Sequence, residues 1–266
     1  MKNLAGIQKW VDLKKGFEPN VSASKLSLFK NDLPMFICKY GFGKKQQASP
    51  SMNRGIIVED AVAAILLEKL DVEAATERAI NRFNQLYIIP DDRVIKEATN
   101  IPPMIRNSYE ALKDYGKPEF QEDGKQEKIQ FDFIDTKNDW SIPVVGFLDL
   151  VFPDSGQIID LKTTAAMPST MSADHQLQRA IYQKAKSNYT VKFLYVTKSK
   201  FDFKEDGDPD HIMEDVRLTI NRLDKFCDTM TPDQARQCIP IQNNFYWVGE
   251  DHMKKFYNQE GENNEL

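Results

Sequence analysis

The feature that most constrains this fold is a stretch of alternating apolar and polar residues at 119–163. It is rich in β-branched and aromatic residues, and it is broken at Gly124, at 136–139 and at 153–156. Alternation with a period of two is typical of strands that bury one face, and the breaks carry residues that favour turns. The middle of the chain is therefore predicted to be a meander of strands.

Helical patterns lie on both sides of this meander. We expect helices at 22–30, from about residue 54, at 71–87, at 100–115, at 176–187 and at 212–230, and a further strand at 191–197. The helix from residue 54 is apolar on most sides, as in a helix buried against a sheet, so Glu59 and Asp60 are conspicuous in it. Together these patterns predict an α/β fold with a mixed central sheet, flanking helices and an N-terminal helical region.

Length and composition favour one large domain at 1–257. The chain has 266 residues, 41% of them hydrophobic, which is enough to bury a sizeable core. We divide the domain into a helical part at 22–116, a catalytic sheet core at 117–200, and a C-terminal helix and tail region at 201–257. Residues 258–266 are polar and acidic without apolar periodicity, so we expect a disordered tail.

Two features predict a soluble, cytoplasmic protein with no membrane partner. The longest apolar run, at 61–67, is too short to span a bilayer, and the first residues lack a signal-peptide core. The cysteines Cys38, Cys227 and Cys238 are odd in number and far apart, which suits buried thiols in a reducing compartment.

Positive charge is local. The formal net charge is −5, so any nucleic-acid contact must come from basic stretches. One is a Gly-, Gln- and Ser-rich segment at 39–54, read as a mobile loop, and the other lies at 184–204. Within them the candidate DNA contacts are Lys44, Lys45, Arg54, Lys198 and Lys200, and the aromatic residues Phe36, Tyr40 and Phe42 could stack on bases. A solvated lysine face and core aromatic packing are the alternatives.

Three charged residues form the chemical centre of the sequence. Asp149 lies on one predicted strand, before the turn at 153–156, and Asp160 and Lys162 lie two apart on the next strand. The side chains of Asp160 and Lys162 therefore project from one face. Their neighbours are apolar, and buried charges need partners. Carboxylates suit Mg²⁺ or Mn²⁺, and a lysine with a pKa depressed by its surroundings can orient or deprotonate water and offset developing charge.

The triplet Asp-x-Lys decides little by itself. It also begins at Asp12, Asp135 and Asp202, and a structural salt bridge is the alternative interpretation. Only the triplet at Asp160 follows a second aspartate across a predicted hairpin.

Five motifs in a fixed order carry a family resemblance over about residues 22–200. They are Ser22-Ala-Ser24, Gly55-Ile-Ile-Val-Glu59, Gly146-Phe-Leu-Asp149, Asp160-Leu-Lys162-Thr and Gln178-Arg-Ala-Ile-Tyr182. The chain resembles the RecB-like exonuclease branch of the PD-(D/E)XK nuclease superfamily, including CRISPR-associated and phage members. The resemblance implies a restriction-endonuclease-like core.

The resemblance also implies a site. Asp149 and Asp160 would ligate Mg²⁺ or Mn²⁺, the Leu161 carbonyl would be a further ligand, and Lys162 would be the catalytic lysine. Glu59 would complete the site where many relatives have a histidine, although Asp60 could be the inward residue instead.

One helix should contribute two more residues. Gln178 and Tyr182 are four apart and share a helical face, where the amide can reach the lysine or a phosphate and the ring can brace it. A core aromatic is the alternative for Tyr182, and His175 just before this helix is either a substrate contact or a surface histidine.

Iron-sulfur relatives place one cysteine after the first helix and three near the C-terminus. This chain has Leu33-Pro34 at the first of these places and only Cys227 and Cys238 late in the sequence. We predict no iron-sulfur cluster.

The expected function is a divalent-metal-dependent DNA exonuclease acting on single-stranded ends, in DNA processing, recombination or degradation in a bacterial or phage-infected cell. A structure-specific or flap endonuclease of the same fold and a catalytically silent DNA-binding module are the alternatives. An unrelated fold with chance motifs would place Asp149 far from Asp160.

Overall fold

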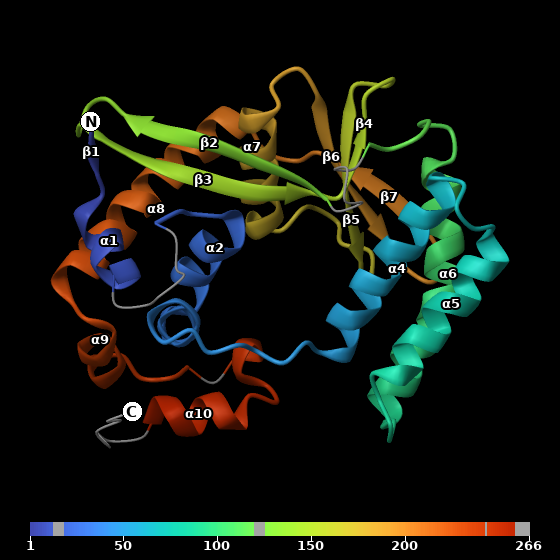
Figure 1. Ribbon diagram of the computed structural model, residues 1–266, viewed down its shortest axis with the longest axis horizontal. Coiled ribbons are helices and arrows are strands. Elements are labelled where there is room, and N and C mark those ends of the chain that lie inside the picture. The colour runs from blue at the N-terminus through green and yellow to red at the C-terminus, as the bar shows by residue number, and fades with distance from the viewer. Residues whose placement is uncertain (13–18, 120–125, 243, 259–266) are drawn as a thin grey trace. The chain divides into compact units, whose positions relative to one another are not determined.

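The computed structural model describes residues 1–12, 19–119, 126–242 and 244–258 (Figure 1). The chain divides into two compact units, each built from separate stretches of sequence. Unit 1 comprises Met1–Gln47, Gln130–Val145 and Asp210–Leu266, and unit 2 comprises Ala48–Ile129 and Gly146–Pro209. The single domain expected at 1–257 stays a prediction.

Unit 2 contains a four-stranded mixed sheet in the order β4-β5-β6-β7. Its strands are β4 (Leu150–Phe152), β5 (Gln157–Thr163), β6 (Thr190–Val196) and β7 (Phe201–Lys204). β5 is antiparallel to β4 and parallel to β6, and β7 returns antiparallel to β6. The expected mixed sheet is confirmed.

One face of this sheet is covered by α4 (Pro50–Leu66) and α6 (Asp92–Leu112), and α5 (Val72–Gln85) packs on these two helices (Figure 1). Ile159 and Leu161 of β5 pack there in a buried core shared with the three helices. Because side chains alternate along a strand, Asp160 and Lys162 project from the opposite face.

The face that carries Asp160 lies against α7 (Ala173–Ala185). The register pairs Asp160 with Phe193 and Lys162 with Tyr195, so these two aromatic residues lie on the same face of the sheet as Asp160. The side chain of His175, in the first turn of α7, packs against both rings. The α7 helix begins earlier than residue 176, because the Ser172 hydroxyl caps it by accepting the N–H of His175.

The sequence also placed the starts of two other helices wrongly. α6 begins at Asp92, where the Asp91 carboxylate accepts the N–H of Val94, and not at Asn100. The helix continues through Pro102 and Pro103, so these prolines do not mark a first turn. In the same way α4 begins at Pro50 and not near Arg54, since Ser49 provides its N-cap.

Unit 1 contains a three-stranded sheet in the order β1-β3-β2, and β1 runs parallel to β3. Its strands are β1 (Lys2–Asn3), β2 (Glu127–Asp135) and β3 (Trp140–Leu148), of which β2 and β3 extend from unit 1 into unit 2. Its helices are α1 (Ala5–Asp12), α2 (Ala23–Asn31), α3 (Leu33–Phe36), the π-helix η1 (Ile37–Gly41), α8 (Pro209–Thr229), α9 (Pro232–Cys238), the 3₁₀ turn η2 (Phe245–Trp247) and α10 (Asp251–Asn258).

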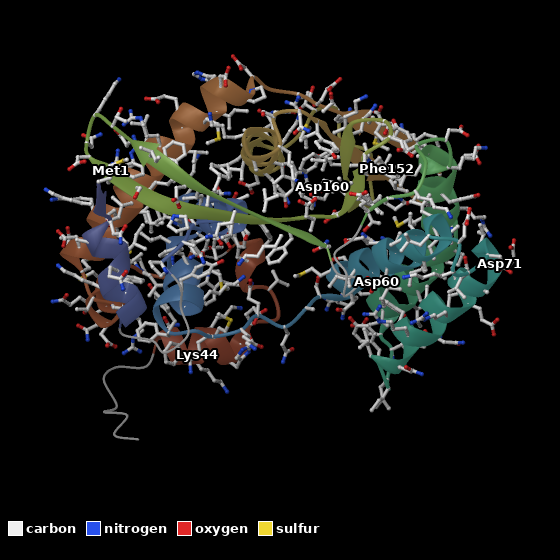
Figure 2. All side chains as sticks on the ribbon, turned by 45° about the horizontal axis from the view of Figure 1, so that its top comes forward. Met1, Lys44, Asp60, Asp71, Phe152 and Asp160 are labelled. Carbon is white, nitrogen blue, oxygen red and sulfur yellow. The ribbon has the colours of Figure 1, made fainter. Side chains whose placement is uncertain are left out.

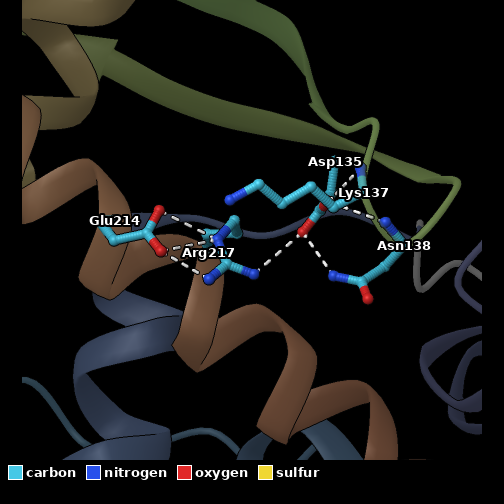
Figure 3. Close-up of polar contacts among 5 residues, drawn as sticks. All are labelled: Asp135, Lys137, Asn138, Glu214 and Arg217. Carbon is cyan, nitrogen blue, oxygen red and sulfur yellow. Dashed lines mark hydrogen bonds and ion pairs between the residues drawn. The ribbon is translucent and has the colours of Figure 1, made fainter.

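The hairpin of unit 1 explains one of the extra Asp-x-Lys triplets. The buried Asp135 carboxylate accepts the backbone N–H groups of Lys137 and Asn138 and a hydrogen bond from Arg217, which also pairs with Glu214 (Figure 3). Burial acts to raise the pKa of Asp135, but the hydrogen bonds, led by those from Asn138, outweigh it and lower the pKa to about 2. This triplet closes a turn.

The three aromatic residues proposed to stack on bases pack against other aromatic rings of the chain. The buried Phe36 packs against Trp10, Phe29 and Tyr40, and Phe42 packs against Phe256. The expected loop at 39–54 is also shorter than predicted, because Lys39 belongs to η1 and the last five residues belong to α4.

Three further expectations concern the surface and the end of the chain. Cys38 and Cys227 are buried thiols, whereas Cys238 is exposed, so the prediction was wrong for it. Asn258 ends α10, and the rest of the expected tail lies outside the described residues. None of the described helices is long and apolar enough to cross a membrane.

Candidate active site

The β4–β5 hairpin brings the two aspartates together. Asp149 stands between β3 and β4, and the register that pairs Leu150 with Ile159 continues to put it opposite Asp160. The Asp149 Oδ2 accepts the N–H of Leu161 at 3.0 Å. Burial raises the pKa of Asp149 well above its usual value, and the charges of Asp160 and Glu59 raise it further. The predicted proximity of the two acids is therefore observed.

Asp160 is the most buried charged group of the site, within the sheet of unit 2 (Figure 2). Its side chain is 0% exposed, and neither carboxylate oxygen has a hydrogen-bond partner among the described residues. Its one close charge partner in the described chain is the ammonium of Lys162. A buried carboxylate without hydrogen bonds is costly, so this group needs further positive charge.

Lys162 has a pKa above its usual value. Burial acts to lower this pKa, but the negative charges of Asp160 and Asp149 outweigh burial and raise it. The expectation of a depressed pKa was wrong for the metal-free chain, because the sequence did not show how closely Asp160 pairs with the amine. Lys162 is here an ammonium and not a base.

Glu59, and not Asp60, lies beside Asp149. Asp60 is exposed on α4 and pairs with Arg82 of α5 (Figure 2). Burial first, and then the charge of Asp160, raise the pKa of Glu59 to about 7. The two candidates differ because successive helical residues point about 100° apart, so only one can face the sheet.

Gln126 is a site residue that the sequence did not indicate. Its Nε2 donates to Glu59 Oε1 at 2.6 Å and to Asp149 Oδ1 at 2.7 Å, so one amide joins two acids from different elements. It belongs to no motif and lies just before β2. Only the tertiary structure could identify it.

Gln178 and Tyr182 contact each other as their spacing predicts. The Gln178 Nε2 donates to the Tyr182 hydroxyl at 2.7 Å, and that hydroxyl donates to the Phe147 carbonyl at 2.5 Å. Tyr182 is 4% exposed, so it is a core aromatic that also holds the strand leading to Asp149. A Cβ on Gly146 would lie 2.7 Å from Tyr182 Cε1, which explains why the motif needs glycine there.

His175 and Tyr195 add a polar pair to the face that carries Lys162. The His175 Nδ1 lies 2.5 Å from the Tyr195 hydroxyl. Burial, and then the positive charge of Lys162, lower the pKa of His175, so the neutral ring is favoured. The surface interpretation of His175 was wrong, since the ring is half-buried between α7 and β6.

The predicted DNA contacts lie in different places. Lys198 and Lys200 are exposed in the turn after β6, at the edge where β5 ends, and Lys45 is exposed in unit 1. Lys44, also in unit 1, lies with its Nζ 4.1 Å from the centre of the Phe256 ring (Figure 2). Arg54 is 3% exposed and pairs with Glu97, so it has no free face for a phosphate.

The residues beside Asp160 fit a hard divalent cation by their chemistry. In the part of the chain that the structure describes, no three His, Cys, Asp or Glu side chains already converge closely enough to hold a metal ion. The Gln126 amide lies between Glu59 and Asp149, and Lys162 lies on Asp160. The atoms available to ligate a metal are nevertheless carboxylate oxygens, the ligand type that Mg²⁺ and Mn²⁺ prefer. Two of these oxygens are buried without hydrogen bonds to any described residue.

Comparison with known proteins places this arrangement in a family. The model of the PD-(D/E)XK nuclease superfamily matches residues 20–235. No curated protein matches the chain. A solved structure described as "Crystal structure of SSO0001" is similar at 11% identity with a TM-score of 0.38, covering 82% of this chain and 84% of that one, a likeness too weak to support an argument.

The chain belongs to the PD-(D/E)XK nuclease superfamily. Membership implies a phosphodiester hydrolase that uses a divalent metal. The mixed sheet with flanking helices agrees with the restriction-endonuclease-like fold of that superfamily.

Proposed function

We propose that this chain is a DNA exonuclease of the RecB-like branch that acts on single-stranded ends with Mg²⁺ or Mn²⁺. The observation that carries the proposal is that Asp160 is buried, forms no hydrogen bond within the described part of the chain, and has an ion pair with Lys162. Asp149 lies opposite it, just before strand β4, and Glu59 is close enough for its charge to interact with that of Asp160. A structural ion pair would not need two further acids with raised pKa values around it.

Asp149, Asp160 and Glu59 would hold the cation, with the Leu161 carbonyl as a further ligand. A bound cation supplies a polarised phosphate oxygen and a more acidic water. This chemistry requires no thiolate ligand, and the absence of an iron-sulfur cluster stays a prediction.

Lys162 would contribute a fixed positive charge. Its ammonium is charged at neutral pH, because the neighbouring acids raise its pKa. A charged amine beside the reacting phosphate offsets the negative charge that develops in the transition state. We assign the lysine to electrostatic stabilisation and orientation of water, and not to proton abstraction.

Gln178 and Tyr182 would position the site. Burial raises the pKa of Tyr182, so the hydroxyl keeps its proton and its bond to Phe147. This bond fixes the strand end two residues before Asp149. Gln178 would reach Lys162 or a substrate phosphate only after leaving the Tyr182 hydroxyl.

The preference for single-stranded ends rests on the resemblance and on the distribution of cations. Lys198 and Lys200 stand exposed where β5 ends, and exposed lysines bind phosphates without reading bases. Lys44 and Lys45 are further candidates. We place the activity in DNA processing, recombination or degradation in the cytoplasm of a bacterial or phage-infected cell.

A comparison of linear and circular substrates tests this function. With Mn²⁺, the full chain should degrade end-labelled linear single-stranded DNA and leave the circular form of the same sequence intact. Without metal, neither should be cut. Cleavage of the circle at a comparable rate would contradict the exonuclease assignment and favour the flap or structure-specific endonuclease. Failure to cut any substrate would favour a silent DNA-binding module.

A further inference from the structure

A cavity of about 730 Å³ opens in unit 2 beside the carboxylates. It runs along α4 from Ile56 to Leu67, which spans about 16 Å at a rise of about 1.5 Å per residue. Glu59, Asp149 and Gln126 line it at the active site. The cavity is therefore continuous with the site and is large enough for more than the reacting phosphate.

The floor of this cavity is apolar. Ile56, Ala63, Leu67 and Leu70 line it, and the ring of Phe147 lies beside Asp149. Ile56 is 49% exposed and Phe147 is 50% exposed, so two large apolar side chains meet solvent within two or three residues of a proposed metal ligand. Aromatic rings exposed next to a nucleic-acid site can stack on bases of any sequence.

Positively charged side chains line the part of the cavity that lies away from the acids. Lys69 and Arg78 line it, and neither forms an ion pair with a residue in the described part of the chain. Arg82 also lines it and is exposed, but it pairs with Asp60. Unpaired cations over an apolar floor complement a chain of phosphates with attached bases better than they complement an apolar peptide.

We propose that the cavity between α4 and α5 binds the single strand next to the scissile phosphate. The Phe147 ring would stack on the base nearest the carboxylates. Arg78, with Lys69, would bind backbone phosphates further along. This inference rests on the proposed nuclease function and adds the path of the substrate and the residues that hold it.

Binding measured without cleavage tests the proposal. The probe is a fluorescein-labelled oligothymidylate of about 12 nucleotides, within the usual size of a single-strand site, and anisotropy is measured with the full chain in EDTA. Phe147→Ala should weaken binding about tenfold, and Phe147→Trp should restore it. Arg78→Glu should weaken binding and reduce the slope of log K against log salt by about 0.7 for each phosphate that the variant no longer neutralises.

Arg93→Glu provides the matched control. It makes the same charge change on an exposed helical arginine that does not line the cavity, so its salt slope should stay near that of the wild type. Equal binding by wild type, Phe147→Ala and Arg78→Glu, with linear DNA still cut by the wild type, would overturn the cavity proposal alone. A wild type that neither binds nor cuts DNA would overturn the proposed function as well.

Discussion

At the residue scale, the site shows how one triplet acquires different roles. Asp160 is 0% exposed and pairs with Lys162 beside two further acids, whereas Asp202, which pairs with Lys204 at 2.8 Å, is 49% exposed. The local sequences are alike, so the difference comes from the burial of the aspartate. In water such a pair contributes about 0–1 kcal/mol, whereas in the sheet the same charges must be compensated.

Lys162→Ala should therefore reduce turnover while leaving binding nearly unchanged. Loss of one positive group at the developing charge should lower kcat by about 10²- to 10³-fold. Single-turnover cleavage and anisotropy with the same linear DNA separate the two effects.

Lys204→Ala is the control for that experiment, because it removes the lysine of an Asp-x-Lys triplet whose aspartate is exposed and lies on another strand. We expect it to cut DNA like the wild type. A Lys162→Ala chain whose defect lies wholly in DNA affinity would show that the amine binds substrate and does not act in the chemical step.

At the element scale, small residues set how closely helices approach the strands that carry the acids. Gly146 leaves room for Tyr182 of α7, and a Cβ on Gly55 of α4 would lie 3.3 Å from Thr163 Oγ1 of β5. The Arg54 guanidinium fixes the same junction by hydrogen bonds to Thr163. Packing thus requires glycine at position 146, and Gly55 marks a close approach of α4 to β5.

Gly146→Ala should destabilise the chain by about 1–3 kcal/mol, the usual cost of overpacking. The new Cβ would force the Tyr182 ring away and strain its bond to Phe147. Chemical denaturation of the single and double variants measures the coupling: with Tyr182→Leu already present, adding Gly146→Ala should cost much less. Equal costs in both backgrounds would mean that the ring is not the obstacle.

At the scale of the whole molecule, unit 2 contains the predicted metal ligands and unit 1 contains none of them. The free energy of unfolding should nonetheless depend on whether these acids are protonated. Burial gives folded Glu59 a pKa of about 7, and the pKa of Asp149 is also raised. The folded state thus binds more protons than the unfolded state between about pH 4.5 and 7.

The metal-free chain should accordingly lose stability as the pH rises through this window, and Mn²⁺ should reverse the loss. At about 100 times its Kd the ion adds about 2.7 kcal/mol. Thermal unfolding in EDTA and in Mn²⁺, at pH values from 5 to about 8, measures both trends. Glu59→Gln should flatten the EDTA curve. A metal-free chain that gains stability over this range, with no response to that substitution, would contradict the burial of Glu59.

Local patterns in the chain were enough to predict the class of fold, the hairpin that pairs Asp149 with Asp160, and the shared helical face of Gln178 and Tyr182. These follow from periods of two and of 3.6 residues, which depend only on local backbone geometry. Two helix starts were predicted too late in the sequence, because Asp91 and Ser49 cap the helices α6 and α4 before their apolar patterns begin.

Which charges are buried could not be predicted without the three-dimensional structure. In the structure Glu59 faces the site and Asp60 pairs with Arg82, Gln126 joins two of the acids, and Arg54 pairs with Glu97. The pKa of Lys162 is raised, whereas the sequence led us to expect a lowered pKa. The physical reason is that the cost of a charge depends on its solvent and its neighbours in space. Those neighbours come from segments distant in sequence, so no local pattern specifies them.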